Sequence, residues 1–181
     1  MTRRIALLLL SALVLAGCSS YTWKSTVPEE MRTVSVPTFR NESDVTELGA
    51  VVTAQLAREF QREGTFSLRR TGAAALEVQG VIESAVTGAR GYRRRSGMRY
   101  SEFVMTMKAK VSLIDKSRSL VLIDNREYTA ETTFSASGDV LTGERNASGR
   151  LAEDLARQVV DDVIAYDYGR DGRKEAGDEA K

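Results

Sequence analysis

The pattern of apolar and polar residues along the chain has a different period in different segments. Over 102–113, apolar residues occupy every second position, while Lys108 and Lys110 lie at positions of the opposite parity. A period of two predicts a long strand with one buried face. Related patterns predict three further strands, over 31–39, 74–86 and 120–134.

A period near 3.6 replaces this alternation over 45–63, where apolar residues recur four positions apart. This spacing predicts an amphipathic helix with a single apolar stripe. Asp44 is a suitable N-cap and, with Glu47 three residues later, gives the pattern of a capping box. Gly64 suits the left-handed position that follows a helix.

A second amphipathic helix is expected over 148–166, with Ser148 as its N-cap, after a loop over 135–149 that is rich in glycine, serine and asparagine. The element order is then strand, helix, three strands and helix. The most economical packing is an α+β fold in two layers, with two helices on one face of a four-stranded, mostly antiparallel or mixed sheet. The strand over 74–86 is expected to lie parallel to the first strand.

Residues 1–17 have the layout of a secretory signal. Arg3 and Arg4 precede an apolar run over 5–16. This run is shorter than the about 20 apolar residues that a membrane-spanning helix needs. We therefore expect residues 1–17 to be removed from the mature protein.

The only cysteine of the chain, Cys18, ends the sequence LAGC. This sequence resembles a bacterial lipobox, in which the cysteine thiol receives a diacylglycerol and the new N-terminal amine is acylated after cleavage. Ser19 follows, and the absence of aspartate there favours sorting to the outer membrane in the Gram-negative pattern. We predict that Cys18 is the lipid anchor. The alternative is an ordinary signal peptide with an unmodified cysteine.

Loss of residues 1–17 removes two arginines and no acid, so the formal net charge changes from +1 to −1. A nearly neutral body needs a local cluster for any electrostatic function. The remaining chain has the size of one domain, and no disulfide can form within it. We expect a lipidated tether over 18–30, a single domain over 31–168 and a disordered, charged tail over 169–181.

The chain contains no histidine, which excludes histidine-based triads, proton shuttles and metal ligands. A lipidated Cys18 leaves no free thiol as a nucleophile, and no glycine-rich phosphate loop is present. The acidic residues are scattered, without the pattern of a metal site. We therefore expect neither enzymatic activity nor a cofactor, with a hydrolase that uses carboxylates as the alternative.

The strongest local feature is a basic segment within the glycine-bounded stretch 87–99, which we interpret as a loop. Guanidinium groups bind phosphates in bidentate fashion, so the segment is a candidate site for an anionic glycolipid. The alternative is a solvated loop that pairs with acids of this domain or of a partner. Nucleic acid is not an expected partner for an exported protein. The candidate residues are Arg90, Arg93, Arg94, Arg95 and Arg99.

The order of the segments carries a resemblance to a known family. A lipobox cysteine and a tether are followed by VPEEMRTVSVPTFRNES (27–43), a helix, AAALEVQGVIES (73–84), a hairpin with VSLIDKSRSLVLID (111–124) and a closing helix. This arrangement resembles the LptE family of lipopolysaccharide-assembly lipoproteins. The best-matching pieces are VSVPTFRN and LEVQGVI.

The resemblance implies a role in lipopolysaccharide transport to the outer leaflet. Members of the family lie inside and beneath the outer-membrane barrel LptD, act as its plug and support its assembly. The expected partners are such a barrel in an equimolar complex, lipopolysaccharide or another anionic glycolipid, and the outer membrane through the N-terminal lipid. The body would face the periplasm or the barrel lumen. The resemblance also implies that the arginine segment contacts phosphates. The alternative is a generic envelope lipoprotein that scaffolds another membrane or cell-wall complex.

Overall fold

The computed structural model describes residues 27–95, 98–136 and 139–168, with the main chain alone for 91–95 and 98–101. The expected signal segment, Cys18 and the expected tail lie outside these residues. The elements, in order, are η2 (Glu29–Met31), β1 (Thr33–Ser35), β2 (Arg40–Asn41), α2 (Leu48–Glu63), β3 (Ser67–Leu68), β4 (Leu76–Arg95), β5 (Met98–Asp115), β6 (Leu120–Ala136) and α3 (Val140–Ala165).

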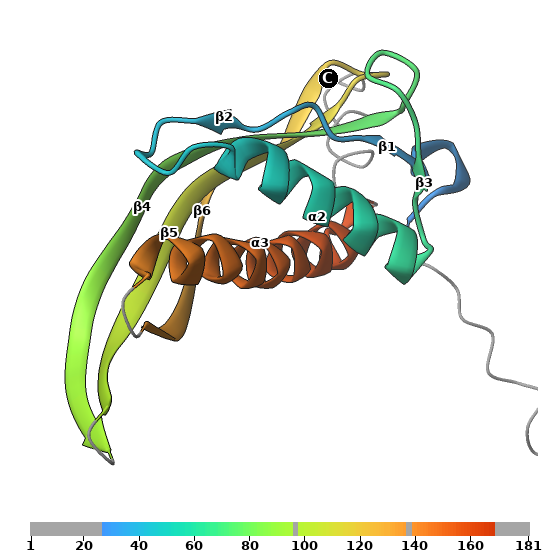
Figure 1. Cartoon of the computed structure of the whole chain (residues 1–181). Helices are drawn as coiled ribbons and strands as arrows, with labels where there is room; N and C mark the ends of the chain where they lie inside the picture. The colour runs from blue at the N-terminus through green and yellow to red at the C-terminus, as the bar shows by residue number, and fades with distance from the viewer. Residues whose placement is uncertain (1–26, 96–97, 137–138, 169–181) are drawn as a thin grey trace, which may run out of the picture.

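Helices α2 and α3 pack against each other on one face of a curved sheet (Figure 1). The opposite face carries no helix in the part of the chain that the structure describes. This two-layer α+β arrangement confirms the predicted fold class. One hydrophobic core fills the space between the layers, and both predicted apolar stripes contribute to it. The buried stripe residues are Leu48, Val52, Leu56 and Phe60 of α2 and Leu151, Leu155, Val159 and Val163 of α3.

The sheet has six strands, so the predicted number of four is wrong. Within the expected first strand over 31–39 only β1 forms, and it ends before Pro37, which has no N–H to donate; β2 is a separate strand beyond that range. β2 and β3 contain two residues each, which is too short for an alternating pattern to show in the sequence. The strand order is β3-β1-β4-β5-β6, and β2 also pairs with β4.

The mixed character of the sheet is confirmed. β1 lies parallel to β4, with Val34 opposite Leu76, as expected for the strands on either side of α2. β4, β5 and β6 form a long antiparallel meander. The buried face of β5 follows the predicted period of two and consists of Met105, Met107, Ala109, Val111 and Leu113.

The interpretation of 87–99 as a loop is wrong. β4 continues to Arg95 and β5 starts at Met98, so the basic segment forms the end of a paired hairpin. Its glycines do not interrupt the pairing, because the register shift between Ala89 and Gly91 accommodates one extra residue as a β-bulge. Local composition favours a loop here, but hydrogen bonds to the opposite strand determine the structure.

The predicted start of the last helix is also wrong, because α3 begins at Val140 and not near Ser148. Asp139 is the N-cap, and its carboxylate accepts hydrogen bonds from the N–H and hydroxyl of Thr142, at 3.2 and 2.5 Å. The glycine in the first turns is used for close packing: a Cβ on Gly143 would lie 2.6 Å from the ring of Phe134. Ser148 lies inside the helix, where its hydroxyl donates to the carbonyl oxygen of Glu144.

The predicted capping box of the first helix is not formed. α2 begins at Leu48, and Glu47 occupies the N-cap with φ 65° and no side-chain capping bond. The predicted role of Gly64 is confirmed, since it adopts φ 82° directly after the helix. At the N-terminal side of the domain, Val27 lies against the body: it is 1% exposed, and its carbonyl oxygen accepts a hydrogen bond from Arg32.

Candidate functional site

The arginine cluster lies at the far end of the β4–β5 hairpin, which extends past both helices (Figure 1). The main-chain register places Arg94 opposite Arg99 and Arg93 opposite Tyr100. Arg90 is exposed and forms no ion pair with any residue that the structure describes. The side chains of Arg93, Arg94, Arg95 and Arg99 lie outside the described structure. Pairing therefore gathers the five candidate residues into one short, two-stranded segment.

An aromatic pair marks the point where the hairpin leaves the core. The ring of Phe103 stacks on that of Phe134, with a centroid separation of 5.3 Å and an interplanar angle of 18°. Gly143 of α3 allows the helix to lie directly against Phe134. The last buried residue of β5 on this side is Met105. The basic end of the hairpin thus projects from a firmly packed base.

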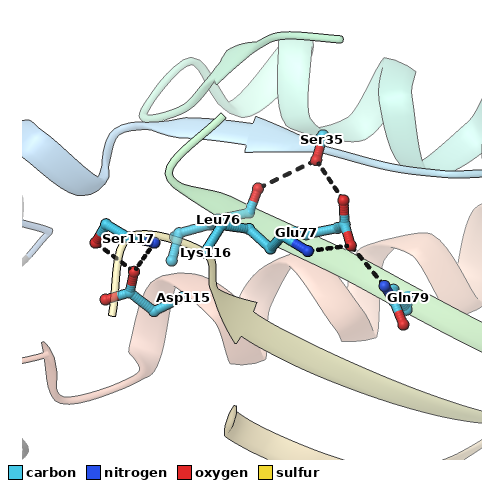
Figure 2. A network of polar contacts seen from close by, with 7 residues as sticks. All are labelled: Ser35, Leu76, Glu77, Gln79, Asp115, Lys116 and Ser117. Carbon is cyan, nitrogen blue, oxygen red and sulfur yellow. Dashed lines mark hydrogen bonds and ion pairs between the residues drawn. The ribbon is translucent and has the colours of Figure 1, made fainter. Parts of the chain in front are cut away.

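A buried polar network anchors the opposite end of the meander (Figure 2). Glu77 is only 2% exposed, and its carboxylate accepts hydrogen bonds from Ser35 Oγ at 3.4 Å and Gln79 Nε2 at 2.5 Å. The ammonium group of Lys116 lies 3.4 Å from the same carboxylate. These contacts link β1, β4 and the turn after β5. Glu77 therefore has a structural role.

Asp115 closes the turn between β5 and β6. It is fully buried, and its Oδ1 accepts hydrogen bonds from the N–H and hydroxyl of Ser117, at 2.9 and 2.6 Å, and from the N–H of Arg118. Its Oδ2 accepts no hydrogen bond from a described residue and lies 3.8 Å from Arg118 Nε. Both buried carboxylates thus have structural contacts, Glu77 between strands and Asp115 within a turn.

A row of charges crosses the uncovered face of the sheet. Lys110 Nζ lies 2.7 Å from a carboxylate oxygen of Glu83 and 3.8 Å from one of Glu127, which joins β4, β5 and β6. The hydrogen bond to Glu83 raises the pKa of Lys110 above its usual value. This lysine is paired within the domain, whereas Arg90 on the hairpin forms no ion pair with any described residue.

An ion pair fixes α3 to the edge strand β6. Arg126 Nη1 lies 2.7 Å from Asp162 Oδ2, and the hydroxyl of Tyr128 donates a hydrogen bond to the same oxygen at 2.9 Å. Burial, and then the neighbouring Asp162, raise the pKa of Tyr128 to about 12. The phenol is therefore held in its protonated, hydrogen-bonded form.

Replacement of Tyr128 by phenylalanine should cost about 1 kcal/mol at neutral pH, because one hydrogen bond is lost. The folded-state pKa of about 12 lies above the ordinary value of 10.0, so the contribution is complete below pH 10 and is lost as the pH rises to about 12. Urea unfolding of both proteins over this range should show the wild-type advantage shrinking. A wild-type advantage in the free energy of unfolding that stays constant to pH 12 would contradict the raised pKa of Tyr128.

The packing of one aromatic side chain was not foreseen from the sequence, although it joins the two pieces that match the family best. Phe39, in VSVPTFRN, is 3% exposed, and a Cβ on Gly80, in LEVQGVI, would lie 2.0 Å from its ring. A Cβ on Gly49 of α2 would lie 2.4 Å from the carbonyl oxygen of Phe39. The N–H of Phe39 donates to the hydroxyl of Thr53 at 2.9 Å. The glycines signal a close approach, but a sequence does not show which residue makes it.

The described residues include no cluster of three or more metal-ligating side chains. None of the helices in this part of the chain has the length and apolar character needed to cross a membrane.

The described chain is a two-layer α+β domain that extends a basic hairpin beyond its core. Residues 31–163 match the family described as LptE, lipopolysaccharide-assembly, and the chain belongs to this family. At the level of the family, the role of the chain is lipopolysaccharide assembly in the cell envelope, which is not an enzymatic role.

Two solved structures share the fold. The hypothetical protein CT253 from Chlamydia trachomatis superposes with a TM-score of 0.54 at 13% identity, over 75% of this chain and 97% of that chain. Uncharacterized lipoprotein B from Nitrosomonas europaea gives a TM-score of 0.51 at 14% identity, over 83% of this chain and 92% of that chain. At these identities the likeness shows the fold alone. No curated protein matches the sequence.

Proposed function

We propose that this chain is a lipid-anchored outer-membrane protein that occupies an LptD-type barrel, supports its assembly and assists the passage of lipopolysaccharide to the outer leaflet. The observation that carries the proposal is the LptE family match over residues 31–163, which spans nearly the whole described domain. The proposed organisation has a signal over 1–17, a tether over 18–30, a domain over 31–168 and a tail over 169–181.

The arginine hairpin is proposed to contact the phosphates of the glycolipid. It combines five guanidinium groups in a chain whose net charge is close to zero, so the positive field is local. Arg90 is exposed without an ionic partner among the described residues. Glu83, the last acidic residue of β4, is already paired with Lys110. These features favour an external anion over an internal ion-pair network as the ligand of the hairpin.

Cys18→Ser should move most of the protein from the membrane to the soluble periplasmic fraction, because the proposed acyl chains supply the membrane affinity. Fractionation, with mass spectrometry of the N-terminal peptide, measures both the location and the modification. Ser19→Asp is the matched control: it should keep the lipid but change the membrane in which the protein is found. An unmodified Cys18 in a membrane-bound wild-type protein would contradict the anchor.

Depletion of the protein tests the proposed function itself. We expect lipopolysaccharide at the cell surface and the amount of assembled barrel to fall together. A generic scaffold would leave both unchanged, since its target is another envelope or cell-wall complex. Unchanged surface lipopolysaccharide after full depletion would therefore favour that alternative.

A further inference from the structure

A groove of about 460 Å³ lies between the first turns of α2 and α3, at the end of the helices from which the hairpin extends (Figure 1). Its floor is apolar, because Leu48 is buried and Val45 and Val51 are half-buried there. Leu141 stands at its side and is 74% exposed, which is the highest value among the large apolar side chains of the described structure. Apolar surface exposed in a groove is a common feature of partner-binding sites.

Carboxylates surround this apolar floor. Asp44, Glu47 and Glu144 line the groove, and none of them forms an ion pair with a residue that the structure describes. Glu47 is not used as a helix cap either, since its side chain makes no capping bond. Arg145 is the one cation among the lining residues, so three carboxylates face a single guanidinium group. A ligand that fits the groove therefore combines apolar surface with positive charge.

The end of the β4–β5 hairpin has this composition. Residues 90–100 contain five arginines, two tyrosines and a methionine, and they contain no acidic residue. The main-chain pairing places Arg94 opposite Arg99, and like charges opposite each other across two strands are destabilising. Contact with an acidic surface relieves this repulsion. We propose that the end of the hairpin of one copy binds in the groove between α2 and α3 of a second copy.

The contact joins two different surfaces and is therefore heterologous. Within one copy, the hairpin leads away from the helices, and its end lies apart from the start of α2 (Figure 1). The pairing of β4 with β5 continues to Arg95 and Met98, which holds the hairpin in this direction. The groove of the same chain is thus out of its reach, and both surfaces stay open for another copy. The inference is independent of the function proposed above.

Sedimentation velocity of the full, lipidated chain in detergent, over a range of concentrations, measures this self-association. The wild type should form larger species as the concentration rises. Glu47→Lys combined with Glu144→Lys should weaken the association roughly tenfold, because two attractive contacts become repulsive. Arg93→Glu combined with Arg94→Glu should have the same effect from the other surface. A mixture of the two double variants should associate again, because the acidic hairpin of one variant then meets the basic groove of the other.

Glu131→Lys combined with Asp161→Lys is the matched control, since both residues are exposed and neither lines the groove. It changes the net charge equally and should leave the self-association of the wild type unaltered. A photoreactive benzoylphenylalanine in place of Leu141 should cross-link to a peptide from residues 90–100 of another copy, which isotope labelling of that copy identifies. A wild type that is monomeric at every concentration, equal losses in the groove and control variants, no association in the mixture, or cross-links that miss the hairpin would overturn the proposal.

Discussion

Replacement of Phe39 by alanine should lower the free energy of unfolding by about 3–5 kcal/mol, because a fully packed aromatic ring leaves a cavity between α2 and β4. Gly80→Ala should cost about 1–3 kcal/mol by overpacking, since its new methyl would overlap the same ring. The double variant should cost less than the sum of the two, because the methyl then occupies part of the vacated space. Denaturant unfolding measures all three values.

Gly88→Ala provides the matched control for this prediction. Gly88 lies on the same strand as Gly80, but a Cβ there would have no neighbour within 4 Å. The control variant should be neutral or slightly more stable, by up to about 1 kcal/mol, through the reduced freedom of the unfolded chain. If Gly80→Ala costs no more than Gly88→Ala, the contact between the ring of Phe39 and Gly80 does not hold β2 and α2 on the sheet.

Simultaneous replacement of Arg93, Arg94 and Arg95 by serine should lower the affinity for purified, phosphorylated lipopolysaccharide roughly 100-fold at low salt. Each lost charge-assisted contact to a phosphate should cost about 1 kcal/mol. Added salt should reduce the difference between wild type and variant, because exposed charges are screened. The thermal unfolding midpoint should change little, since the hairpin end lies beyond the buried residues of β5.

A triple replacement of Arg58, Arg69 and Arg70 by serine is the control, because it removes the same charge from exposed positions on α2 and the β3–β4 connection. This variant should bind lipopolysaccharide as the wild type does. Equal losses in the two triple variants would mean that only net charge matters. Unchanged binding of the hairpin variant at low salt would contradict a role of these arginines in recognition.

The parts of the fold that the sequence predicts are those in which many residues repeat one pattern. The stripes of α2 and α3 and the alternation in β5 each involve several residues that face one core, so their periods are clear. β2 and β3 are set by hydrogen bonds to neighbouring strands, and two residues carry no period. The first turns of α3 contain Gly143, which is a poor helix former. The packing of Gly143 on Phe134 compensates for this and is not visible in the sequence.

In the candidate site, too, local features can be predicted from the sequence and long-range contacts cannot. The arginines are conspicuous by composition, and the sequence locates them near the end of a strand. Their placement on a paired hairpin depends on register, which joins Arg94 to Arg99 across the turn. The buried contacts of Glu77 and the close approach of Phe39 to Gly80 depend on segments about 40 residues apart in the chain. Such long-range contacts cannot be derived from local spacing.

The proposed barrel partnership is tested most directly by purification of the tagged, lipidated protein from detergent-solubilised outer membranes, with quantification of every bound protein by mass spectrometry. We expect one large outer-membrane barrel in an equimolar amount, and loss of that barrel when Cys18→Ser prevents anchoring. Recovery of the chain without a barrel, or with a different envelope complex or cell-wall fragments, would contradict the proposed barrel partnership.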